Sequence, residues 1–455
     1  MSSRSLRFLL VNPAAPQWRV TAGSRPRGIT RVFRFSMLSS LAVAAAMPEG
    51  VETRILDEEV EPLDFEEPAD LVGISFMTFN APRAYEIADT FRRKGRPVVL
   101  GGYHPTFQPD EALGHAEAVC VGEAEANVER LVGDFLAGRL RPIYEEKAAD
   151  LSGLRRPDRT LVPRGRYAWV DAIQATRGCP HGCTFCSISS FFGRRFRTRP
   201  VEDVVDELRG LGPRILFLDD NLTVDADYAR ELFARMIPLG KRWFSQSSVA
   251  LADDPGLLEL AVKSGCRGVF VGFESLSQDG LTAFRKEFAC ARDYRRAIER
   301  FHDAGVAVQA GIVLGHDADG PGVFRETLDF LLSAKVDALQ ATILTPFPGT
   351  PLFAEMEAAG RIVDHDWSHY DFRHVVFEPK RMSRETLQAG HDGLLARFYS
   401  LRAVAGRLLG EISYLGPGTI LRATAPVNLG YRVRLRKDRT WRSDGAVLAG
   451  GPHTA

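Results

Sequence analysis

Three of the six cysteines stand together in the segment CPHGCTFC, from Cys179 to Cys186, with the spacing C-x3-C-x2-C. Closely spaced thiolates are typical ligands of zinc and of iron–sulfur clusters. A structural zinc site usually needs four ligands in paired knuckles, and the three scattered cysteines do not complete such a set. His181 remains an alternative fourth zinc ligand. The pattern favours a cubane cluster that leaves one iron open.

The cysteine segment follows a strand predicted at 170–176, so the thiols lie on a loop at the carboxyl end of a strand, where barrel enzymes place their chemistry. Polar side chains end two later strands in the same way: Asp219 and Asp220 after ILFL, and Glu274 and Ser275 in VFVGFES. The carboxylates of Asp219 and Asp220 could hold a ligand's ammonium group. The alternative interpretation is that they only cap the following helices.

The elements that position these residues form six strand–helix units between 168 and 380. The helix predicted from 201 illustrates the pattern, with an apolar stripe that includes Val204 and Leu208, and with Pro200 at its start. Six units are too few for a complete eightfold barrel. The sequence therefore predicts an open, six-stranded partial barrel.

Residues 1–145 also alternate strand and helix patterns, which predicts a five-stranded, doubly wound domain of flavodoxin type with its ligand at the carboxyl ends of the strands. Residues 146–167, rich in Arg, Pro and Gly, are predicted to form a linker. A mainly helical extension is expected over 381–455, with Ser383 as an N-cap. Within it, residues 431–436 alternate apolar and Arg side chains, typical of a solvated edge strand or, alternatively, of contact with anionic lipid.

Composition narrows the class of protein. The chain has 58 Lys plus Arg and 58 Asp plus Glu, which gives no reason to expect a nucleic-acid partner. The apolar run FLLV near the N-terminus is too short for a signal peptide, and the longest apolar stretch breaks at Pro48. Six cysteines in 455 residues do not form a disulfide framework. We therefore expect a cytoplasmic protein, with peripheral membrane contact as an open alternative.

The cysteine motif, with an aromatic residue before its last cysteine and its place after the first strand of a six-unit barrel, closely resembles the radical S-adenosylmethionine (radical SAM) superfamily. The resemblance implies a [4Fe–4S] cluster held by Cys179, Cys183 and Cys186, with S-adenosylmethionine chelated by the open iron. The residues expected to contact S-adenosylmethionine are Phe185, Asp219, Asp220, Glu274, Ser275 and Gly311.

The first domain resembles the cobalamin-binding domain that one large subgroup of this superfamily carries. The matching segments are VVLGGYHPTFQP (98–109) and VCVGEAEANVERLV, which ends at Val132. The residues expected to contact cobalamin are Asn12, Ser75, Gly101, Gly102, His104, Gly122 and Glu123. The Asp-x-His-x-x-Gly motif of other cobalamin proteins is absent, so any cobalamin would bind without that histidine. A vestigial domain that only covers the barrel is the alternative.

The segment 343–379, which begins ILTPFPGTPLF, resembles a branch that contains hopanoid C-2 methylase and bacteriochlorophyll side-chain methylases. That resemblance implies methylation of an unactivated carbon: a 5′-deoxyadenosyl radical removes hydrogen and methylcobalamin supplies the methyl group. It also implies an apolar substrate and an electron donor such as flavodoxin or ferredoxin. The branch's Pro-Pro-Leu-Gly is replaced here by residues 33–42, and its Lys-x-x-Asn by Lys286-x-x-Ala289.

Two alternative functions stay open at this point. One is a cobalamin-containing radical enzyme that performs cyclisation, ring contraction, hydroxylation or carbon–carbon coupling. The other is a non-catalytic iron–sulfur protein that relays electrons, which would not need the carboxylates at the strand ends or a second cofactor-sized domain. No residue of the chain is assigned as a catalytic base.

Overall fold

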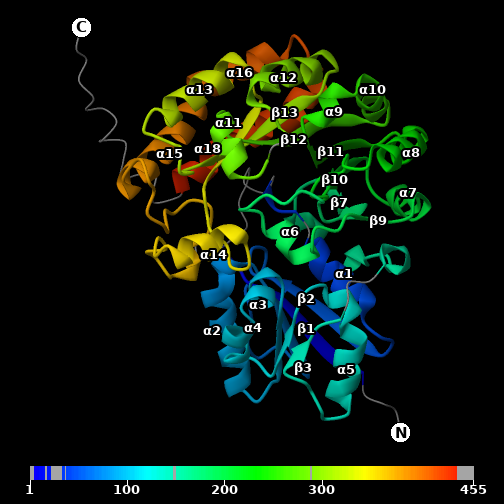
Figure 1. Cartoon of the computed structure of the whole chain (residues 1–455). Coiled ribbons are helices and arrows are strands. Elements are labelled where there is room, and N and C mark those ends of the chain that lie inside the picture. The colour runs from blue at the N-terminus through cyan, green and yellow to red at the C-terminus, as the bar shows by residue number, and fades with distance from the viewer. Residues whose placement is uncertain are drawn as a thin grey trace.

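The computed structural model describes residues 5–15, 18–21, 33–35, 37–146, 150–286 and 289–437. The chain forms an N-terminal α/β unit, a larger α/β unit and a layer of C-terminal helices (Figure 1). Part of the predicted linker, 147–149, and the end of the predicted C-terminal extension, 438–455, lie outside the described residues. No helix of the described part is long and apolar enough to cross a membrane.

The N-terminal unit contains a six-stranded parallel sheet in the order β2-β1-β3-β4-β5-β6. Its strands are β1 (Leu6–Asn12), β2 (Val51–Asp57), β3 (Leu71–Ser75), β4 (Val98–Gly101), β5 (Ala118–Cys120) and β6 (Ile143–Tyr144). The flavodoxin-like order is confirmed. The prediction of five strands was short by one, because β6 has only two residues and leaves no periodic signal.

Helices cover both faces of this sheet, as the near-continuous apolar strands predict. They are α1 (Leu38–Ala46), α2 (Ala81–Arg93), α3 (Tyr103–Phe107), α4 (Pro109–Leu113) and α5 (Val128–Leu136). In β1, Leu9 and Val11 belong to the core on the α2 side, whereas Phe8 and Leu10 belong to the core on the α5 side. Because both faces are buried, β1 reads as the unbroken run FLLV.

The central unit contains a second six-stranded parallel sheet, in the order β7-β10-β11-β12-β13-β14. Its strands are β7 (Asp171–Ile173), β10 (Arg214–Phe217), β11 (Arg242–Ser247), β12 (Cys266–Glu274), β13 (Ala307–Leu314) and β14 (Ala338–Ile343). Since β7 and β14 are the two ends of the order, the barrel is open, as predicted.

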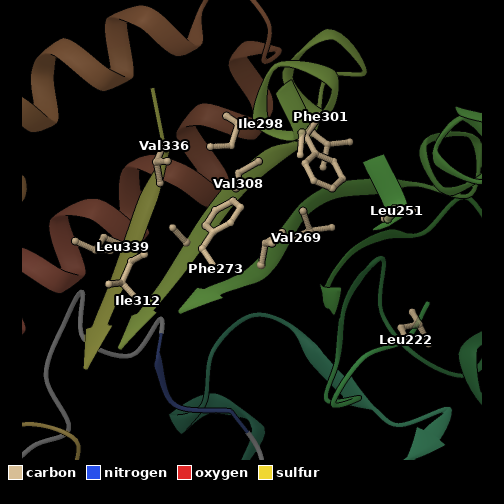
Figure 2. Close-up of a cluster of buried hydrophobic side chains, with 14 of the residues drawn as sticks. Leu222, Leu251, Val269, Phe273, Ile298, Phe301, Val308, Ile312, Val336 and Leu339 are labelled. Atoms are coloured by element: carbon tan, nitrogen blue, oxygen red, sulfur yellow. The ribbon is translucent and has the colours of Figure 1, made fainter. Parts of the chain in front are cut away.

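Helices surround the outer face of this sheet (Figure 1). They are α7 (Val201–Arg209), α8 (Ala226–Met236), α9 (Ala250–Asp253), α10 (Pro255–Lys263), α11 (Gln278–Ala283), α12 (Tyr294–Asp303) and α13 (Val323–Ser333). A further helix, α14 (Pro351–Ala358), lies beside the N-terminal unit (Figure 1). In Figure 2, Phe273 and Val308 from the strands lie in one buried cluster with Ile298 and Phe301 from α12. The stripe predicted for 201–208 is buried in the same cluster.

The C-terminal layer consists of α15 (Arg384–Phe398), α16 (Leu401–Glu411), α17 (Pro417–Thr419), a π-helical turn (Ile420–Thr424) and α18 (Ala425–Lys437). Ser383 caps α15 as predicted, because its Oγ accepts a hydrogen bond from Thr386 N. Ser400 Oγ caps α16 in the same way, so the continuous helical pattern is divided in two.

The predicted edge strand at 431–436 is wrong, because this segment belongs to α18. The Tyr431 ring stacks on Tyr399 with centroids 5.0 Å apart, and Gln309 Nε2 donates to Tyr431 Oη at 3.0 Å. Leu435, four residues later, is also buried. A spacing of four places both side chains on one helix face, and the same residues also satisfy the period of a strand.

Candidate active site between the two domains

The cysteines lie on a loop, residues 178–196, whose two ends are held together by the antiparallel pair β8 (Thr176–Arg177) and β9 (Arg197–Thr198). Gly178 makes the first turn with φ of 86°, and a Cβ there would lie 2.0 Å from Arg195 O. A short helix, α6 (Ser187–Phe192), begins directly after Cys186. The loop therefore presents three cysteines on a closed scaffold at the barrel mouth.

The donor set of this loop fits an iron–sulfur cluster. The three cysteines are free thiols, and burial raises the pKa of each, that of Cys183 to about 12. Such thiols become thiolates when a bound metal compensates the charge. Among the described residues, no group of three or more His, Cys, Asp or Glu is arranged to hold a single metal ion. In a cubane each thiolate binds a different iron.

Asp219 is fully buried, and its carboxylate is engaged with the strand that leads into the cysteine loop. Its oxygens accept hydrogen bonds from Ala175 N at 3.0 Å and from Thr176 N and Oγ1 at 2.5 and 2.7 Å. Burial raises the pKa of Asp219 to about 7. In this arrangement the side chain orients the backbone before the loop and does not reach the cavity described below.

Asp220 points to the other side and lines that cavity. Its Oδ2 accepts a hydrogen bond from Gly178 N at 3.0 Å, and burial raises its pKa to about 6. Neither Asp219 nor Asp220 caps the following helix, because Asp225 does so by accepting from Tyr228 N. The alternative interpretation as helix caps is therefore wrong for this pair.

Glu274 ends β12 with a left-handed φ of 62°, where the pairing with β13 shifts register. Such a bulge re-aims a side chain at the end of a strand. Lys286 Nζ donates to Glu274 Oε1 at 2.8 Å and to Gly272 O at 2.7 Å. Lys286, the lysine that the branch's Lys-x-x-Asn also has, is thus bonded to the end of β12. Ser275 is buried, with its Oγ 3.2 Å from His316 Nε2.

Gly311 and Phe185 have packing partners in the barrel. A Cβ at Gly311 would lie 2.7 Å from Phe270 Cζ, so the neighbouring ring explains the glycine. The Phe185 ring meets Phe284 edge-on at 4.8 Å. The predicted S-adenosylmethionine residues thus all belong to the barrel unit, and only Asp220 among the six lines the cavity between the domains.

A cavity of about 640 Å³ separates the cysteine loop from the carboxyl ends of the N-terminal strands. Five of the residues expected to contact cobalamin line it: Asn12, Ser75, Gly102, Gly122 and Glu123. The barrel contributes Gln174, Arg177, Asp220, Phe191 and Phe192, among others. A volume of several hundred Å³ is typical of cofactor and small-molecule sites.

Two observations show that this cavity suits a bound group. Asn12 Nδ2 is buried without a hydrogen-bond partner, while Asn12 Oδ1 accepts from Ser40 Oγ at 2.7 Å. Gly122 has a φ of 77°, and a Cβ there would meet nothing within 4 Å, so the glycine leaves open space at the cavity wall. An unsatisfied buried donor is costly, and an acceptor on a ligand would satisfy it.

Two expected cobalamin residues lie away from the cavity. Gly101 packs against Cys120, whose Cβ would be 3.6 Å from an added Cβ. His104 is fully buried, and its ring lies among Phe76, Tyr85 and Trp367 at centroid distances of 5.1 to 6.1 Å. Neither lines the space between the domains.

An ion-pair network joins the two domains beside this cavity, and sequence reasoning missed it. Glu123 accepts hydrogen bonds from Arg177 Nη1 at 3.0 Å and from Arg197 Nη1 and Nη2 at 2.8 and 2.7 Å. Glu125 accepts from Arg177 Nη2 at 2.5 Å. Since Arg177 and Arg197 stand on β8 and β9, the N-terminal domain holds both ends of the cysteine loop. The available signal in the sequence was the presence of Arg177 and Arg197 on either side of the cysteines.

The segment that departs from the branch's Pro-Pro-Leu-Gly also reaches the cavity. The lining includes Phe33, Arg34, Phe35, Met37, Leu38, Ser39, Ala42, Val43 and Ala46. This segment precedes α1 and forms its first turns. Its contribution to the cavity is visible only after folding.

A second contact between the domains uses aromatic rings. The Phe191 ring lies 4.4 Å from Tyr103 and 6.3 Å from Phe107. Trp367 Nε1 donates to Glu111 Oε1 at 3.0 Å. Trp367 thus packs at the domain interface.

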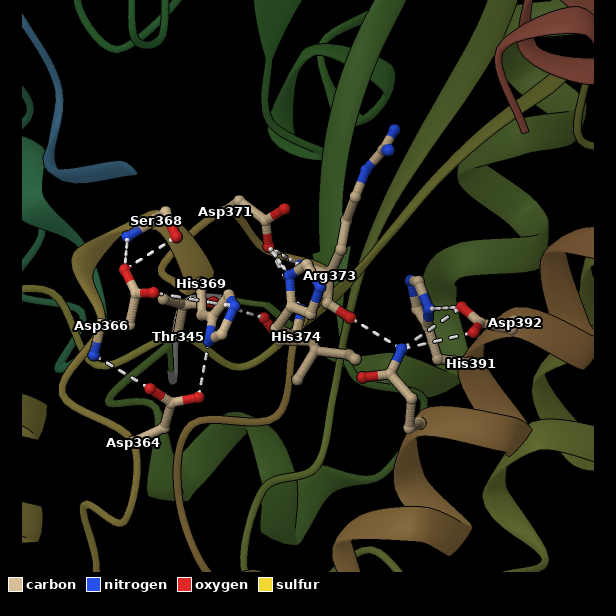
Figure 3. Close-up of polar contacts among 12 residues, drawn as sticks. Thr345, Asp364, Asp366, Ser368, His369, Asp371, Arg373, His374, His391 and Asp392 are labelled. Atoms are coloured by element: carbon tan, nitrogen blue, oxygen red, sulfur yellow. Dashed lines mark hydrogen bonds and ion pairs between the residues drawn. The ribbon is translucent and has the colours of Figure 1, made fainter. Parts of the chain in front are cut away.

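The neighbouring histidines form carboxylate pairs (Figure 3). His369 Nδ1 lies 2.7 Å from Asp364 Oδ2, and His374 Nδ1 lies 2.9 Å from Asp371 Oδ1. The side-chain hydrogen bond with Asp371 raises the pKa of His374 although burial opposes it. Tyr370 is fully buried. These residues support the segment that follows β14.

Comparison with known proteins places this architecture. Residues 173–343 match the radical SAM superfamily, and residues 25–132 match the B12 binding domain. The chain is 34% identical over 82% of its length to bacteriochlorophyllide d C-12(1)-methyltransferase from Chlorobaculum tepidum, covering 85% of that protein. It is 26% identical to hopanoid C-2 methylase from Rhodopseudomonas palustris, with 73% and 66% of the two chains covered.

The fold also matches the radical S-adenosylmethionine methyltransferase TsrM from Kitasatospora setae, solved with cobalamin and a [4Fe–4S] cluster bound. The TM-score is 0.65 at 18% identity, and the match covers 97% of this chain and 100% of the other. The protein is thus a radical SAM enzyme with a cobalamin-binding domain. It belongs to the family of cobalamin-dependent radical SAM methyltransferases, whose cofactors are a [4Fe–4S] cluster, S-adenosylmethionine and cobalamin.

Proposed function

We propose that this methyltransferase acts on an unactivated carbon of a large apolar substrate, and that a tetrapyrrole pigment is the first class to test. The observation that carries the proposal is the cavity of about 640 Å³, which is bounded by both cofactor domains and walled by aromatic rings that include Phe33, Phe79, Phe191 and Phe192. The bacteriochlorophyllide methyltransferase, which the chain matches over most of its length, supports this substrate class.

In this proposal Cys179, Cys183 and Cys186 hold the cluster, and Asp220 contacts S-adenosylmethionine beside it. Glu274, Ser275, Gly311 and Phe185 complete that site at the barrel mouth. When bound, these cofactors supply an organic radical that removes a hydrogen atom from the substrate and a methyl group that replaces it.

The protein's own contribution is position and exclusion of water. The bonds from Arg177 and Arg197 to Glu123 hold the cysteine loop at a fixed place against the N-terminal domain. Residues of the segments 33–35 and 37–46 also line the cavity. A closed, fixed site protects a reactive intermediate from side reactions.

Asn12, Ser75, Gly102 and Gly122 are proposed to hold the cobalamin. No histidine is among the described residues that line the cavity. Cobalamin held there would therefore bind without a histidine from the lining, and it would supply the methyl group. We further propose that an electron donor such as flavodoxin or ferredoxin reduces the cluster.

Peripheral membrane contact is a separate proposal, supported by exposed apolar side chains on the C-terminal helices. Leu409, Ile412 and Leu421 are 70, 65 and 72% exposed. Apolar side chains that project from helices can insert into a bilayer interface. Flotation with anionic vesicles tests this proposal, and protein that stays at the bottom of the gradient would contradict it.

The main experiment is anaerobic. The protein is purified with its reconstituted cluster and hydroxocobalamin, then supplied with methyl-labelled S-adenosylmethionine and bacteriochlorophyllide or other apolar acceptors. We expect bound corrinoid, 5′-deoxyadenosine and label on the acceptor. The variant Cys183→Ala should form neither 5′-deoxyadenosine nor labelled acceptor. 5′-Deoxyadenosine with an unmethylated, rearranged or oxygenated acceptor would overturn the proposal in favour of another radical reaction.

A further inference from the structure

Three arginines that the site does not use lie on or beside the cysteine loop. Arg194, Arg195 and Arg285 are exposed. Phe191 and Phe192 of the same loop line the interdomain cavity. The loop therefore separates the cavity on one side from a positively charged solvent face on the other.

Arg194 is fixed directly on the cysteine loop. A Cβ built at Gly182 would lie 2.8 Å from Cζ and 2.9 Å from Nη2 of Arg194, so the guanidinium covers the residue before Cys183. Arg194 follows Gly193, and both are left-handed, with φ of 55° and 67°. A left-handed conformation is unfavourable for a non-glycine residue. The fold nevertheless holds Arg194 in this conformation and places its guanidinium over the loop.

Arg285 approaches the loop from the barrel side. It is also left-handed, with φ of 52°, and it follows Phe284, whose carbonyl accepts a hydrogen bond from Thr184 N at 3.1 Å. Arg194 and Arg285 therefore flank the segment around Cys183. Within the part of the chain that the structure describes, no carboxylate forms an ion pair with either of them or with Arg195.

We propose that Arg194, Arg195 and Arg285 form the docking surface for an acidic electron-transfer protein that carries a flavin or an iron–sulfur centre. This inference rests on the proposed function, which needs one electron from outside for each cleavage of S-adenosylmethionine. The reduced carrier loses one electron and the oxidised cluster gains it, with no bond formed and no proton moved. Clustered unpaired charge steers an oppositely charged partner and raises its association rate.

The test measures reduction of the reconstituted full-length enzyme by flavodoxin hydroquinone in a stopped-flow instrument. We compare wild type with the double variant Arg195→Glu/Arg285→Glu. Steering contributes about 10- to 1000-fold to association rates at low ionic strength. We expect the second-order rate constant to fall about tenfold or more, with a smaller dependence on salt. Photoreduced deazaflavin, a small reductant, should reduce both proteins at equal rates.

Arg194 is tested by two substitutions. Arg194→Gly removes the charge and relieves the left-handed strain, so the protein should fold, bind iron normally and accept electrons from flavodoxin more slowly. Arg194→Lys should keep most of the rate. Arg93→Glu, at an exposed site on α2, is the matched control and should change nothing.

Equal flavodoxin rates and equal salt dependence in wild type and the double variant would overturn the docking surface. Slower reduction by both flavodoxin and deazaflavin, or loss of iron from the variants, would also overturn it and assign these arginines to cluster stability. Because cluster reduction is measured without an acceptor, failure to methylate a given substrate leaves this test intact.

Discussion

Replacement of Glu123 by alanine tests whether the N-terminal domain holds the cysteine loop in place. The Glu123 carboxylate is 7% exposed and accepts three hydrogen bonds from two guanidinium groups. Removal of one partner from a buried ion pair costs about 3–5 kcal/mol. Arg177 keeps Glu125 as a partner, and Arg197 is 17% exposed and can be partly hydrated. We therefore expect a loss at the lower end, about 3 kcal/mol.

Two assays report this loss. The midpoint of urea unfolding of the cofactor-free protein should fall, and backbone amides on β8 and β9 should exchange with deuterium faster than those on β12 or β13. Since burial alone would raise the pKa of Glu123 but its arginine partners lower it overall, the stabilisation is full above the ordinary glutamate pKa of 4.5 and is lost as the pH falls through the lower folded-state value. The difference between wild type and variant should therefore shrink in acid.

Glu129→Ala is the matched control, because Glu129 is exposed on α5 nearby. A double-mutant cycle with Arg197→Ala should give a coupling energy of about 1 kcal/mol or more. The reasoning is refuted if Glu123→Ala costs no more than the control, or if exchange on β8 and β9 stays unchanged.

Three further outcomes follow from the structure. Asp219→Asn should reduce the amount of iron bound after reconstitution, because an amide cannot accept from all the donors of Ala175 and Thr176. Asp220→Asn should bind a normal amount of iron but cleave S-adenosylmethionine poorly. Iron assays and the yield of 5′-deoxyadenosine measure the two effects. Burial raises the pKa of Glu411 from 4.5 to about 7, which corresponds to about 3 kcal/mol of destabilisation when the carboxyl is ionised. Glu411→Gln should therefore stabilise the protein by up to that amount at pH 8 and by little below pH 4.5. Equal urea midpoints of wild type and variant at both pH values would contradict this prediction. Gly349→Ala should lower the melting temperature, because its φ is 80° and the Cβ would lie 2.1 Å from Phe107 Cδ1; Phe107→Ala in the same chain should restore only part of the loss.

Much of this architecture could be predicted because local pattern and tertiary fold agree. The unbroken run in β1 reports burial on both faces, and the helix after Pro200 forms where its stripe predicts. The alternation at 431–436 failed because residues four apart share a helix face and also fit a strand's period. The spacing of apolar residues alone does not determine which part of the core these side chains pack against.

For the site residues, too, some placements could be predicted from the sequence and others could not. Asp219 and Asp220 are adjacent in the sequence and equivalent in type, yet one is bonded to the backbone before the loop and the other lines the cavity. His104 was expected to contact cobalamin because segment 98–109 resembles the cobalamin-binding domain, but it is buried among rings outside the cavity. Successive residues at the end of a strand point to opposite sides, and only the packed neighbours decide which side holds the ligand.

The sequence by itself determined the class of chemistry and the two-domain plan, because the cysteine spacing, the strand-end carboxylates and the alternation of strands with helices are all local patterns. Only the tertiary structure decided how the domains meet: Glu123 on Arg177 and Arg197, Phe107 on Gly349, and residues of 33–35 and 37–46 along the cavity. These contacts join residues far apart in the chain. Their existence depends on the shape and charge of two surfaces at once, which no local period encodes.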